Sequence, residues 1–141
     1  MTRKKLLFIV NIPEFFISHR LSLALLAQLK GYEVHVATTY SQNFKKINGY
    51  GFKCHKIYLK RGSLNFFNDL ITFISIYKVL KDLKPDVLHL LTAKCNIYGG
   101  LASRLISISR VVHAVTGLGY IFVDTKKNYK KILRKTVLFL Y

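Results

Sequence analysis

The chain has 141 residues, of which 51% are hydrophobic, and its 23 Lys and Arg against 6 Asp and Glu give a formal net charge of +17. The hydrophobic fraction excludes a disordered basic tail, because a disordered chain is poor in apolar residues as well as highly charged. The length suits one domain and excludes two complete α/β domains. The positive charge favours anionic partners such as nucleic acid, acidic lipid head groups or phosphorylated substrates; a lysine-rich surface without a function is the alternative.

The first part of the chain predicts a strand, a loop and a helix. Lys5–Val10 is apolar throughout, as expected for a strand buried on both faces of a parallel sheet. The loop Asn11–Ile17 leads to Ser18, which is a good helix N-cap. Gly31 occupies the position just after a helix end. The apolar residues between them recur at helical spacing: Leu21, Leu25, Leu26 and Leu29.

Extended and helical segments then alternate along the chain. Strands that alternate with helices at this spacing indicate βαβ units, and right-handed crossovers build such units into a doubly wound parallel sheet. The predicted fold class is therefore α/β, a Rossmann-like sheet in three αβα layers. The predicted strands are Glu33–Thr38, Lys53–Leu59, Asp86–Leu91 and Val111–Val115, and the predicted helices are Ser41–Gly49, Asn65–Leu83 and Asn96–Ile106.

Residues 126–141 follow a different pattern. Lysines and arginines alternate with apolar residues at helical period, and residues 137–141 are apolar on every side. We expect a basic amphipathic helix that lies on a membrane or packs against protein that this chain lacks. The expected domain is thus residues 1–125, followed by this helix. A span of the bilayer is not expected, because it requires about 18 consecutive apolar residues.

Ligands of an open parallel sheet bind beyond the carboxyl ends of its strands, so the loops after the strands hold the candidate site. The loop after the first strand contains no G-x-G-x-x-G motif, and NAD binding is therefore not expected. His19 is expected in the first turn of the next helix, where free N–H groups and the helix dipole favour an anion. A solvated helix start is the alternative for this residue.

The loop after the third strand, Lys60–Asn65, has the composition of a phosphate cradle. Gly62 permits an unusual backbone angle, and Ser63 or Asn65 can cap the next helix. Arg61 and the lysine before it supply positive charge. An ordinary helix start without a ligand is the alternative, because many helices begin with Ser or Asn.

Two later loops add candidate residues. Lys94 follows the fourth strand, and the glycine-bearing turn Thr116–Tyr120 brings backbone N–H groups close to any ligand there.

Other notable residues have structural explanations. Gly99 and the glycine after it are expected to allow close packing of a helix on the sheet. His89 is expected to be a packed, hydrogen-bonded core residue. The sequence shows neither a pair of carboxylates spaced for acid–base catalysis nor a Ser/His/Asp or Cys/His arrangement for nucleophilic catalysis, so no catalytic residue is predicted. The two cysteines match no metal or redox spacing.

Six segments of the chain carry a combined signature: Asn11–Arg20, Gly31–Thr38, Arg61–Asn65, Lys84–His89, Tyr98–Arg104 and Gly117–Phe122. Their order and spacing, over about residues 4–123, resemble the start of family 4 glycosyltransferases. The most similar branch extends lipid-linked sugars in bacterial O-antigen, capsule or protein-glycan assembly. The chain departs from many relatives at Thr116 and Leu91, where they carry histidines, and in the loop after the first strand, which lacks their glycines.

The resemblance implies a GT-B fold, in which two Rossmann-like domains face a cleft. The N-terminal domain holds the acceptor, here a saccharide linked to a (poly)prenyl diphosphate, and the C-terminal domain holds a nucleotide sugar. The resemblance also implies transfer with retention of anomeric configuration, without a metal or other cofactor. The acceptor-binding residues that it implies are Asn11, His19, Arg61, Ser63, Asn65 and Lys94, with Thr116, Gly117 and Gly119 lining the cleft.

The donor-side signature of the family is a pair of glutamates eight positions apart in the C-terminal domain. The two glutamates of this sequence, Glu14 and Glu33, do not form that pair. We therefore expect a chain that is cut short before its donor domain, or that works with a separately encoded one. Such a chain alone is expected to be inactive, because catalysis requires groups arrayed around both substrates.

The alternative function is that of a non-enzymatic basic module that binds an anionic membrane or nucleic acid. RNA recognition uses surface aromatic residues interleaved with basic ones. The aromatic residues here fall mostly at core spacing, so nucleic acid is not expected as a partner. Instead, the basic face and residues 126–141 are expected to hold the domain peripherally on the inner face of the cytoplasmic membrane.

Overall fold

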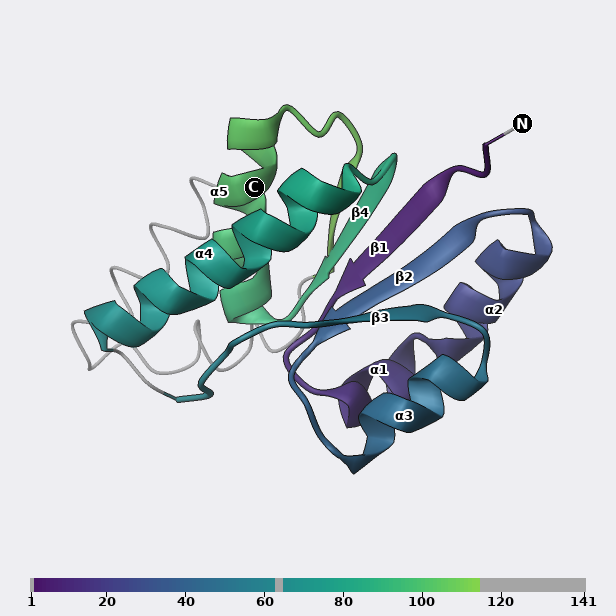
Figure 1. Ribbon diagram of the computed structural model, residues 1–141, viewed down its shortest axis with the longest axis horizontal. Helices are drawn as coiled ribbons and strands as arrows, with labels where there is room; N and C mark the ends of the chain where they lie inside the picture. Colours follow the sequence, from purple (N-terminus) through teal and green to yellow (C-terminus); the bar gives the residue numbers. More distant parts are fainter. Residues whose placement is uncertain (1, 63–64, 115–141) are drawn as a thin grey trace.

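The structure, a computed structural model, describes residues 2–62 and 65–114. Within these residues, five parallel strands form one sheet of order β3-β2-β1-β4-β5 (Figure 1). The predicted α/β class with a Rossmann-like parallel sheet is therefore confirmed. The strands are β1 (Lys5–Ile9), β2 (Glu33–Thr38), β3 (Lys53–Lys56), β4 (Val87–Leu91) and β5 (Val111–Ala114).

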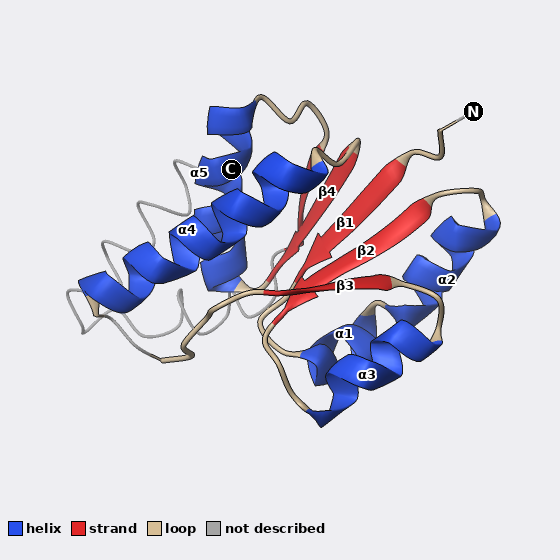
Figure 2. Cartoon of the chain, in the orientation of Figure 1, coloured by secondary structure: helices blue, strands red, loops and turns tan. Residues whose placement is uncertain are grey.

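Helices cover both faces of the sheet and complete three layers (Figure 2). One face carries α1 (Pro13–His19), α2 (Leu21–Leu29) and α3 (Gln42–Gly49), and the other carries α4 (Phe66–Leu83) and α5 (Ala93–Ile106). Because side chains alternate along a strand, each face has its own core. On the first face Phe8 contacts Phe16, with ring centroids 5.4 Å apart. On the second face Leu7 and Ile9 pack with Ile76. Full burial of such a side chain contributes about 1.5–3 kcal/mol, so these cores hold the layers together.

The neighbours β1 and β4 are far apart in sequence but adjacent in the sheet. From β1 the chain runs through β2 to β3 on one side, and it returns to β4 on the other side of β1. Phe8 pairs with His89, which sets the carboxyl ends of the two strands level. The loops that leave these two ends diverge, and such a divergence makes the crevice where open α/β sheets bind ligands.

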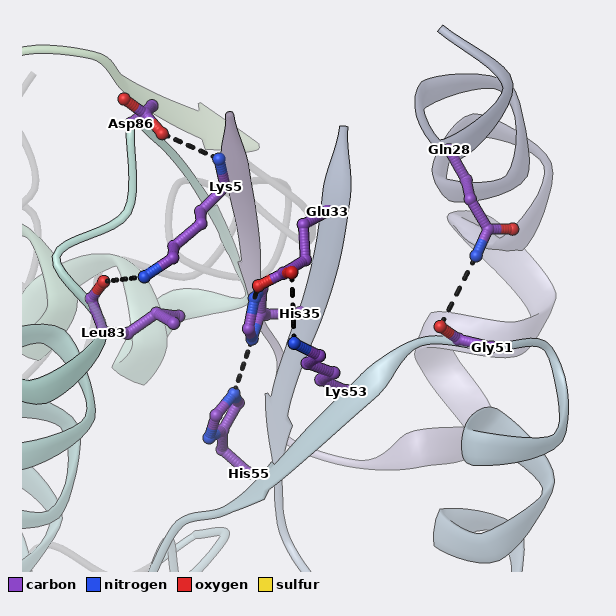
Figure 3. Close-up of polar contacts among 9 residues, drawn as sticks. All are labelled: Lys5, Gln28, Glu33, His35, Gly51, Lys53, His55, Leu83 and Asp86. Atoms are coloured by element: carbon purple, nitrogen blue, oxygen red, sulfur yellow. Dashed lines mark hydrogen bonds and ion pairs between the residues drawn. The ribbon is translucent and has the colours of Figure 1, made fainter. Parts of the chain in front are cut away.

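Polar contacts tie the strands together at their amino ends (Figure 3). The backbone N–H of Lys5 donates to Asp86 Oδ2 at 2.7 Å, which links β1 to the segment before β4. Glu33 accepts from Lys53 Nζ at 3.0 Å and lies 2.7 Å from His35 Nε2. The hydrogen bonds from Lys53 and His35, in that order, lower the pKa of Glu33. These contacts join β2 and β3 at the end of the sheet that the candidate site does not use.

The loop predicted at Asn11–Ile17 is wrong, because α1 begins at Pro13. Proline suits the first position of a helix, since its φ is already fixed and no amide donor is needed there. Burial of Phe16 holds this short helix on the sheet. Ser18 is not an N-cap: it lies inside α1, and its hydroxyl donates to a carbonyl one turn earlier at 3.0 Å. The next helix, α2, begins at Leu21.

β3 is shorter than predicted and ends at Lys56, not at Leu59. The amide of Ile57 still donates to the carbonyl of Thr38 on β2 at 3.0 Å, but the next amide, that of Tyr58, donates to Ser75 Oγ on α4 at 2.9 Å. Apart from β3, α1, the start of α2 and α5, the predicted strands and helices agree with the described elements to within about one residue. Val115, the predicted end of β5, lies outside the described residues.

α5 begins at Ala93, about one turn before the predicted start at Asn96. The close packing predicted for its glycines is confirmed. A Cβ atom on Gly99 would overlap the side chain of Leu90 on β4, and one on Gly100 would lie 3.1 Å from the His113 ring. The two glycines therefore allow α5 to lie directly against the sheet.

Candidate functional site

A small cavity of about 170 Å³ lies beyond the carboxyl ends of the strands, where β1, β3 and β4 lead into loops. Asn11 lines it from the loop after β1, Arg61 from the loop after β3, and Lys94 from the start of α5. The sequence indicated these three residues in three separate loops, and the fold brings them together around one space. The other lining residues are Leu59, Gly62, Thr92 and Ala93.

A larger cavity of about 510 Å³ lies at the amino ends of the strands. Lys4, Asp86 and Arg110, which precede β1, β4 and β5, line it. Open α/β sheets bind their ligands at the carboxyl ends of the strands, where loop backbone and helix N-termini converge. The smaller cavity is therefore the candidate site.

Local contacts fix the backbone around the candidate site. The side-chain Oδ1 atom of Asn11 accepts from the amide of Ile12 at 2.9 Å, and the backbone carbonyl of Asn11 accepts from Thr39 Oγ1 at 2.8 Å. Gly62 has a φ of +67°, so the unusual backbone angle predicted for it is confirmed. The exposed side chain of Arg61 thus extends from a tight turn beside the cavity.

An ion pair from the neighbouring helix anchors Lys94. Its Nζ lies 2.7 Å from Oδ1 of Asp69, in the first turn of α4, and donates to the carbonyl of Lys60 at 3.2 Å. Both side chains of the pair are 21% exposed, so they are largely shielded from water. The pair joins α4, α5 and the loop after β3 at the cavity. The sequence does not single out Asp69, because an acidic residue in the first turn of a helix needs no ligand to explain it.

Asn65 has a structural role at the start of α4. Its Oδ1 accepts from the amide of Phe67 at 2.9 Å, which is the bond of a helix N-cap. The helix-cap interpretation of this residue is confirmed, and it is not among the residues that line the cavity. Contact between Asn65 and an acceptor stays a prediction. Four other predicted site residues lie outside the described residues, together with the expected helix 126–141: Ser63, Thr116, Gly117 and Gly119.

His19 lies at the last position of α1, and its predicted place in the first turn of a helix is wrong. Its ring stacks on Phe15 with a centroid distance of 4.2 Å, and Nδ1 lies 2.6 Å from Ser18 Oγ. The C-terminus of a helix carries negative partial charge, so α1 does not favour an anion at this residue. The error follows from the missed helix, because the extra turn places His19 at an end and not at a start. Its contact with an acceptor stays a prediction.

His89, in the middle of β4, is packed as predicted but not hydrogen-bonded at Nε2. Its ring stacks on Phe8 with a centroid distance of 5.1 Å. Among the described residues, the buried Nε2 atom has no hydrogen-bond partner. Burial first, and then the charge of Arg20, lower the pKa of His89 to about 4. The imidazole is therefore neutral at physiological pH and belongs to the core beneath the crevice.

Thr92, directly after β4, has an unusual backbone. Its φ of +70° and ψ of +157° lie in a region that essentially only glycine occupies without strain. Such strain is common beside binding sites, where the surrounding structure enforces it. Thr92 lines the cavity and directs the chain from β4 into α5. No feature of the sequence marks this residue, since threonine is disfavoured at this geometry.

Among its described residues, the site offers groups that bind and no complete catalytic set. Arg61 and Lys94 supply positive charge, and Asn11 supplies an amide. Such groups suit a phosphate or diphosphate with an attached polar group. Within residues 2–62 and 65–114, no group of three or more His, Cys, Asp or Glu side chains is placed to hold a metal ion.

Solved structures share this architecture at low sequence identity. MurG of Acinetobacter baumannii is 21% identical, with a TM-score of 0.61, over 81% of this chain and 36% of that one. The UDP-GlcNAc 2-epimerase of Neisseria meningitidis is 18% identical, with a TM-score of 0.59, over 92% of this chain and 37% of that one. A glycosyltransferase of Rickettsia africae, 12% identical with a TM-score of 0.61 over 89% of this chain and 35% of that one, has the same architecture. A transferase and an epimerase therefore share the fold, and the fold alone does not choose between activities.

Curated relatives match parts of the sequence more closely. The UDP-Gal:alpha-D-GlcNAc-diphosphoundecaprenol alpha-1,3-galactosyltransferase of Escherichia coli is 36% identical over 73 residues, which are 52% of this chain and 18% of that protein. The N,N'-diacetylbacillosaminyl-diphospho-undecaprenol alpha-1,3-N-acetylgalactosaminyltransferase of Campylobacter jejuni is 33% identical over 92 residues, 65% of this chain and 24% of that protein. The chain thus spans about a fifth to a quarter of these relatives. The family model described as "Glycosyl transferase 4-like" matches residues 5–140. The chain therefore belongs to the glycosyl transferase 4-like family, as the resemblance predicted.

Proposed function

We propose that this chain is the acceptor side of a retaining glycosyltransferase. It seats a saccharide linked to a polyprenyl diphosphate, to which a sugar is transferred from a nucleotide sugar in cell-surface polysaccharide or glycan assembly. The observation that carries the proposal is the convergence of Asn11, Arg61 and Lys94 on one cavity at the carboxyl ends of the strands. Family membership and the diphosphoundecaprenol-linked acceptors in the names of both curated relatives support it.

The proposed acceptor contacts divide by charge. Arg61 and Lys94 bind the diphosphate, because charge-assisted hydrogen bonds to phosphate are stronger than neutral ones. The amide of Asn11 binds a hydroxyl of the first sugar. Further contacts around the head group come from His19, Ser63 and Asn65. The cleft is lined by Thr116, Gly117 and Gly119. In this arrangement the protein's own cations neutralise the diphosphate, and neither a metal nor another cofactor takes part.

We propose that these 141 residues alone do not transfer sugar. Catalysis stabilises a transition state that includes both substrates, and the described site contains only groups suited to the acceptor. The family's donor-side pair of glutamates is not in the sequence. A separate polypeptide, or a continuation of the chain, then supplies the donor side. Sugar transfer by the purified 141-residue chain would contradict this part of the proposal.

The enzyme acts at the cytoplasmic face of the membrane in this proposal. A net charge of +17 favours an anionic surface, at about 1 kcal/mol for each well-placed Lys or Arg. The basic face and residues 126–141 make the peripheral contact. The helices that the structure describes include none that is both long and apolar enough to cross a bilayer.

The proposal is tested by acceptor binding to the full chain. We expect Arg61→Gln to weaken binding of a GlcNAc-diphosphate-prenyl acceptor about tenfold, the effect of one lost charge-assisted hydrogen bond. Arg110→Gln is the matched control, because Arg110 is also exposed but lies before β5, at the opposite end of the sheet. Calorimetric titration measures both. Equal affinities for the wild type and Arg61→Gln, or equal losses in the two variants, would remove the acceptor role from this cavity.

A further inference from the structure

An apolar groove of about 380 Å³ lies between α4 and α5. These two helices run side by side on one face of the sheet (Figure 1). Five of the groove's six lining residues are apolar or aromatic: Phe66, Leu70, Phe73, Tyr98 and Leu101. Its volume falls in the range of small-molecule sites, about 300–1,000 Å³.

The apolar lining of the groove is exposed to an unusual degree. Phe66 is 74% exposed, Leu70 is 43% exposed and Leu101 is 40% exposed. Exposed hydrophobic residues continue along α4 at Phe67 and Ile71. Single exposed hydrophobic residues need no explanation, but a contiguous set around a groove marks a binding surface.

The groove adjoins the charged cavity across one ion pair. Asp69, the sixth lining residue of the groove, pairs with Lys94, which lines the cavity. Tyr98 stands at the same boundary: its ring lines the groove, and its hydroxyl lies beside the carboxylate of Asp69. Burial and Asp69, in that order, raise the pKa of Tyr98 to about 12, so this hydroxyl stays neutral. An apolar and a cationic binding surface therefore meet at Asp69.

We infer that the groove binds the isoprenoid hydrocarbon next to the diphosphate of the acceptor. The inference rests on the proposed function, which places the diphosphate at Arg61 and Lys94. An amphiphile with a diphosphate head and a hydrocarbon tail matches both surfaces at once, because the tail leaves the head where the cavity meets the groove. Burial of the tail would release water from the exposed Phe66, Leu70 and Leu101. Acceptor selection would then depend on the lipid as well as on the sugar.

The test compares farnesyl diphosphate, below its micellar concentration, with inorganic pyrophosphate as ligands of the full chain. We expect the farnesyl group to tighten binding at least tenfold, and Leu70→Asn to remove about tenfold of this gain by exposing hydrocarbon to a polar side chain. Binding of pyrophosphate stays unchanged in this variant. Leu105→Asn is the matched control, because Leu105 is a 68% exposed leucine of α5 outside the groove lining. Leu101→Asn provides the same test from the other wall, and circular dichroism verifies that each variant folds.

The outcomes separate the inference from the proposed function. If pyrophosphate binds and the farnesyl group adds nothing, the inference is overturned and the proposed function stands. If neither ligand binds, the cationic cavity loses its role and both fail. If Leu70→Asn leaves the binding of farnesyl diphosphate unchanged but weakens binding to anionic vesicles, this face is a membrane contact. The inference that the groove binds the isoprenoid hydrocarbon is then overturned. If Leu70→Asn shifts the NMR signals of residues 126–141 in the absence of ligand, the groove holds that segment of the chain, and the inference is likewise overturned.

Discussion

Lys94, in the first turn of α5, and Asp69, in the first turn of α4, form a 2.7 Å ion pair between residues 25 positions apart in the chain. The pair closes the candidate site on one side and the apolar groove on the other. One polar contact thus fixes the relative position of two surfaces with opposite chemistry.

The Asp69–Lys94 pair should stabilise the fold more than a surface ion pair does. We expect a double-mutant cycle with Asp69→Asn and Lys94→Met to give a coupling energy of about 1–2 kcal/mol, above the range of about 0.2–1 kcal/mol for exposed pairs. Urea unfolding of the two single variants and the double variant measures it. The Glu33–Lys53 pair is the control, since its lysine is 62% exposed. Equal coupling in the two pairs would mean that burial does not strengthen the first.

Gly99→Ala should destabilise the protein although alanine is the better helix former. The new Cβ would overlap Leu90 on β4, and overpacking of a core typically costs about 1–3 kcal/mol. The matched control is Gly49→Ala, because Gly49 is also helical but a Cβ there meets no atom within 4 Å. We expect the control to be neutral or to stabilise by up to about 1 kcal/mol. A stabilising Gly99→Ala would contradict the close packing of α5 on the sheet.

Acid should destabilise the fold through its buried and partly buried histidines. The pKa of His89 falls from its ordinary value of 6.5 to about 4 in the folded chain. The unfolded chain therefore binds protons below pH 6.5 before the folded chain does, and the free energy of unfolding falls between pH 6.5 and about 4. Burial also lowers the pKa values of His35, His55 and His113, with the same sign.

The contribution of His89 can be isolated by substitution. His89→Gln should flatten the loss of unfolding free energy between pH 7 and pH 5, because the glutamine does not titrate. His19→Gln is the control, since His19 is an exposed histidine. Urea unfolding at the two pH values provides the measurement. The same pH dependence in wild type and His89→Gln would exclude His89 as a source of acid sensitivity.

Thr92→Gly should increase the free energy of unfolding by about 1 kcal/mol, because glycine adopts the backbone angles of this residue without strain. Thr92→Ala is the control, since it also removes the hydroxyl but keeps the Cβ that causes the strain. The difference between the two unfolding free energies measures the strain stored beside the cavity. If the two variants are equally stable, the backbone after β4 is relaxed.

The sequence predicted the fold well because its strongest signals are local. Buried apolar runs alternate with helices, and this alternation is enough to place Asn11, Arg61 and Lys94 at the same end of a parallel sheet. The prediction fails at Asn11–Ile17 because proline usually interrupts regular structure, whereas Pro13 begins a helix. This error moves His19 from the start of one helix to the end of another.

Other features of the site depend on tertiary geometry and leave no mark in the sequence. The contact between Asp69 and Lys94 exists only because α4 and α5 pack together on one face. The backbone of Thr92 is forced by its position between β4 and α5, against the preference of its residue type. In the sequence the apolar groove looks like part of an ordinary amphipathic helix, because periodicity shows which residues share a face and not whether that face is covered.

The parallel direction of the strands has a consequence for engineering. The strands are clamped together at one rim of the sheet, their amino ends, by contacts of Lys5, Asp86 and Glu33. The loops that would choose a ligand all leave the other rim, at the carboxyl ends. Stiffness and selectivity are thereby assigned to opposite ends of the same scaffold. Substitutions that strengthen the clamped rim can be introduced first, before the specificity loops are diversified.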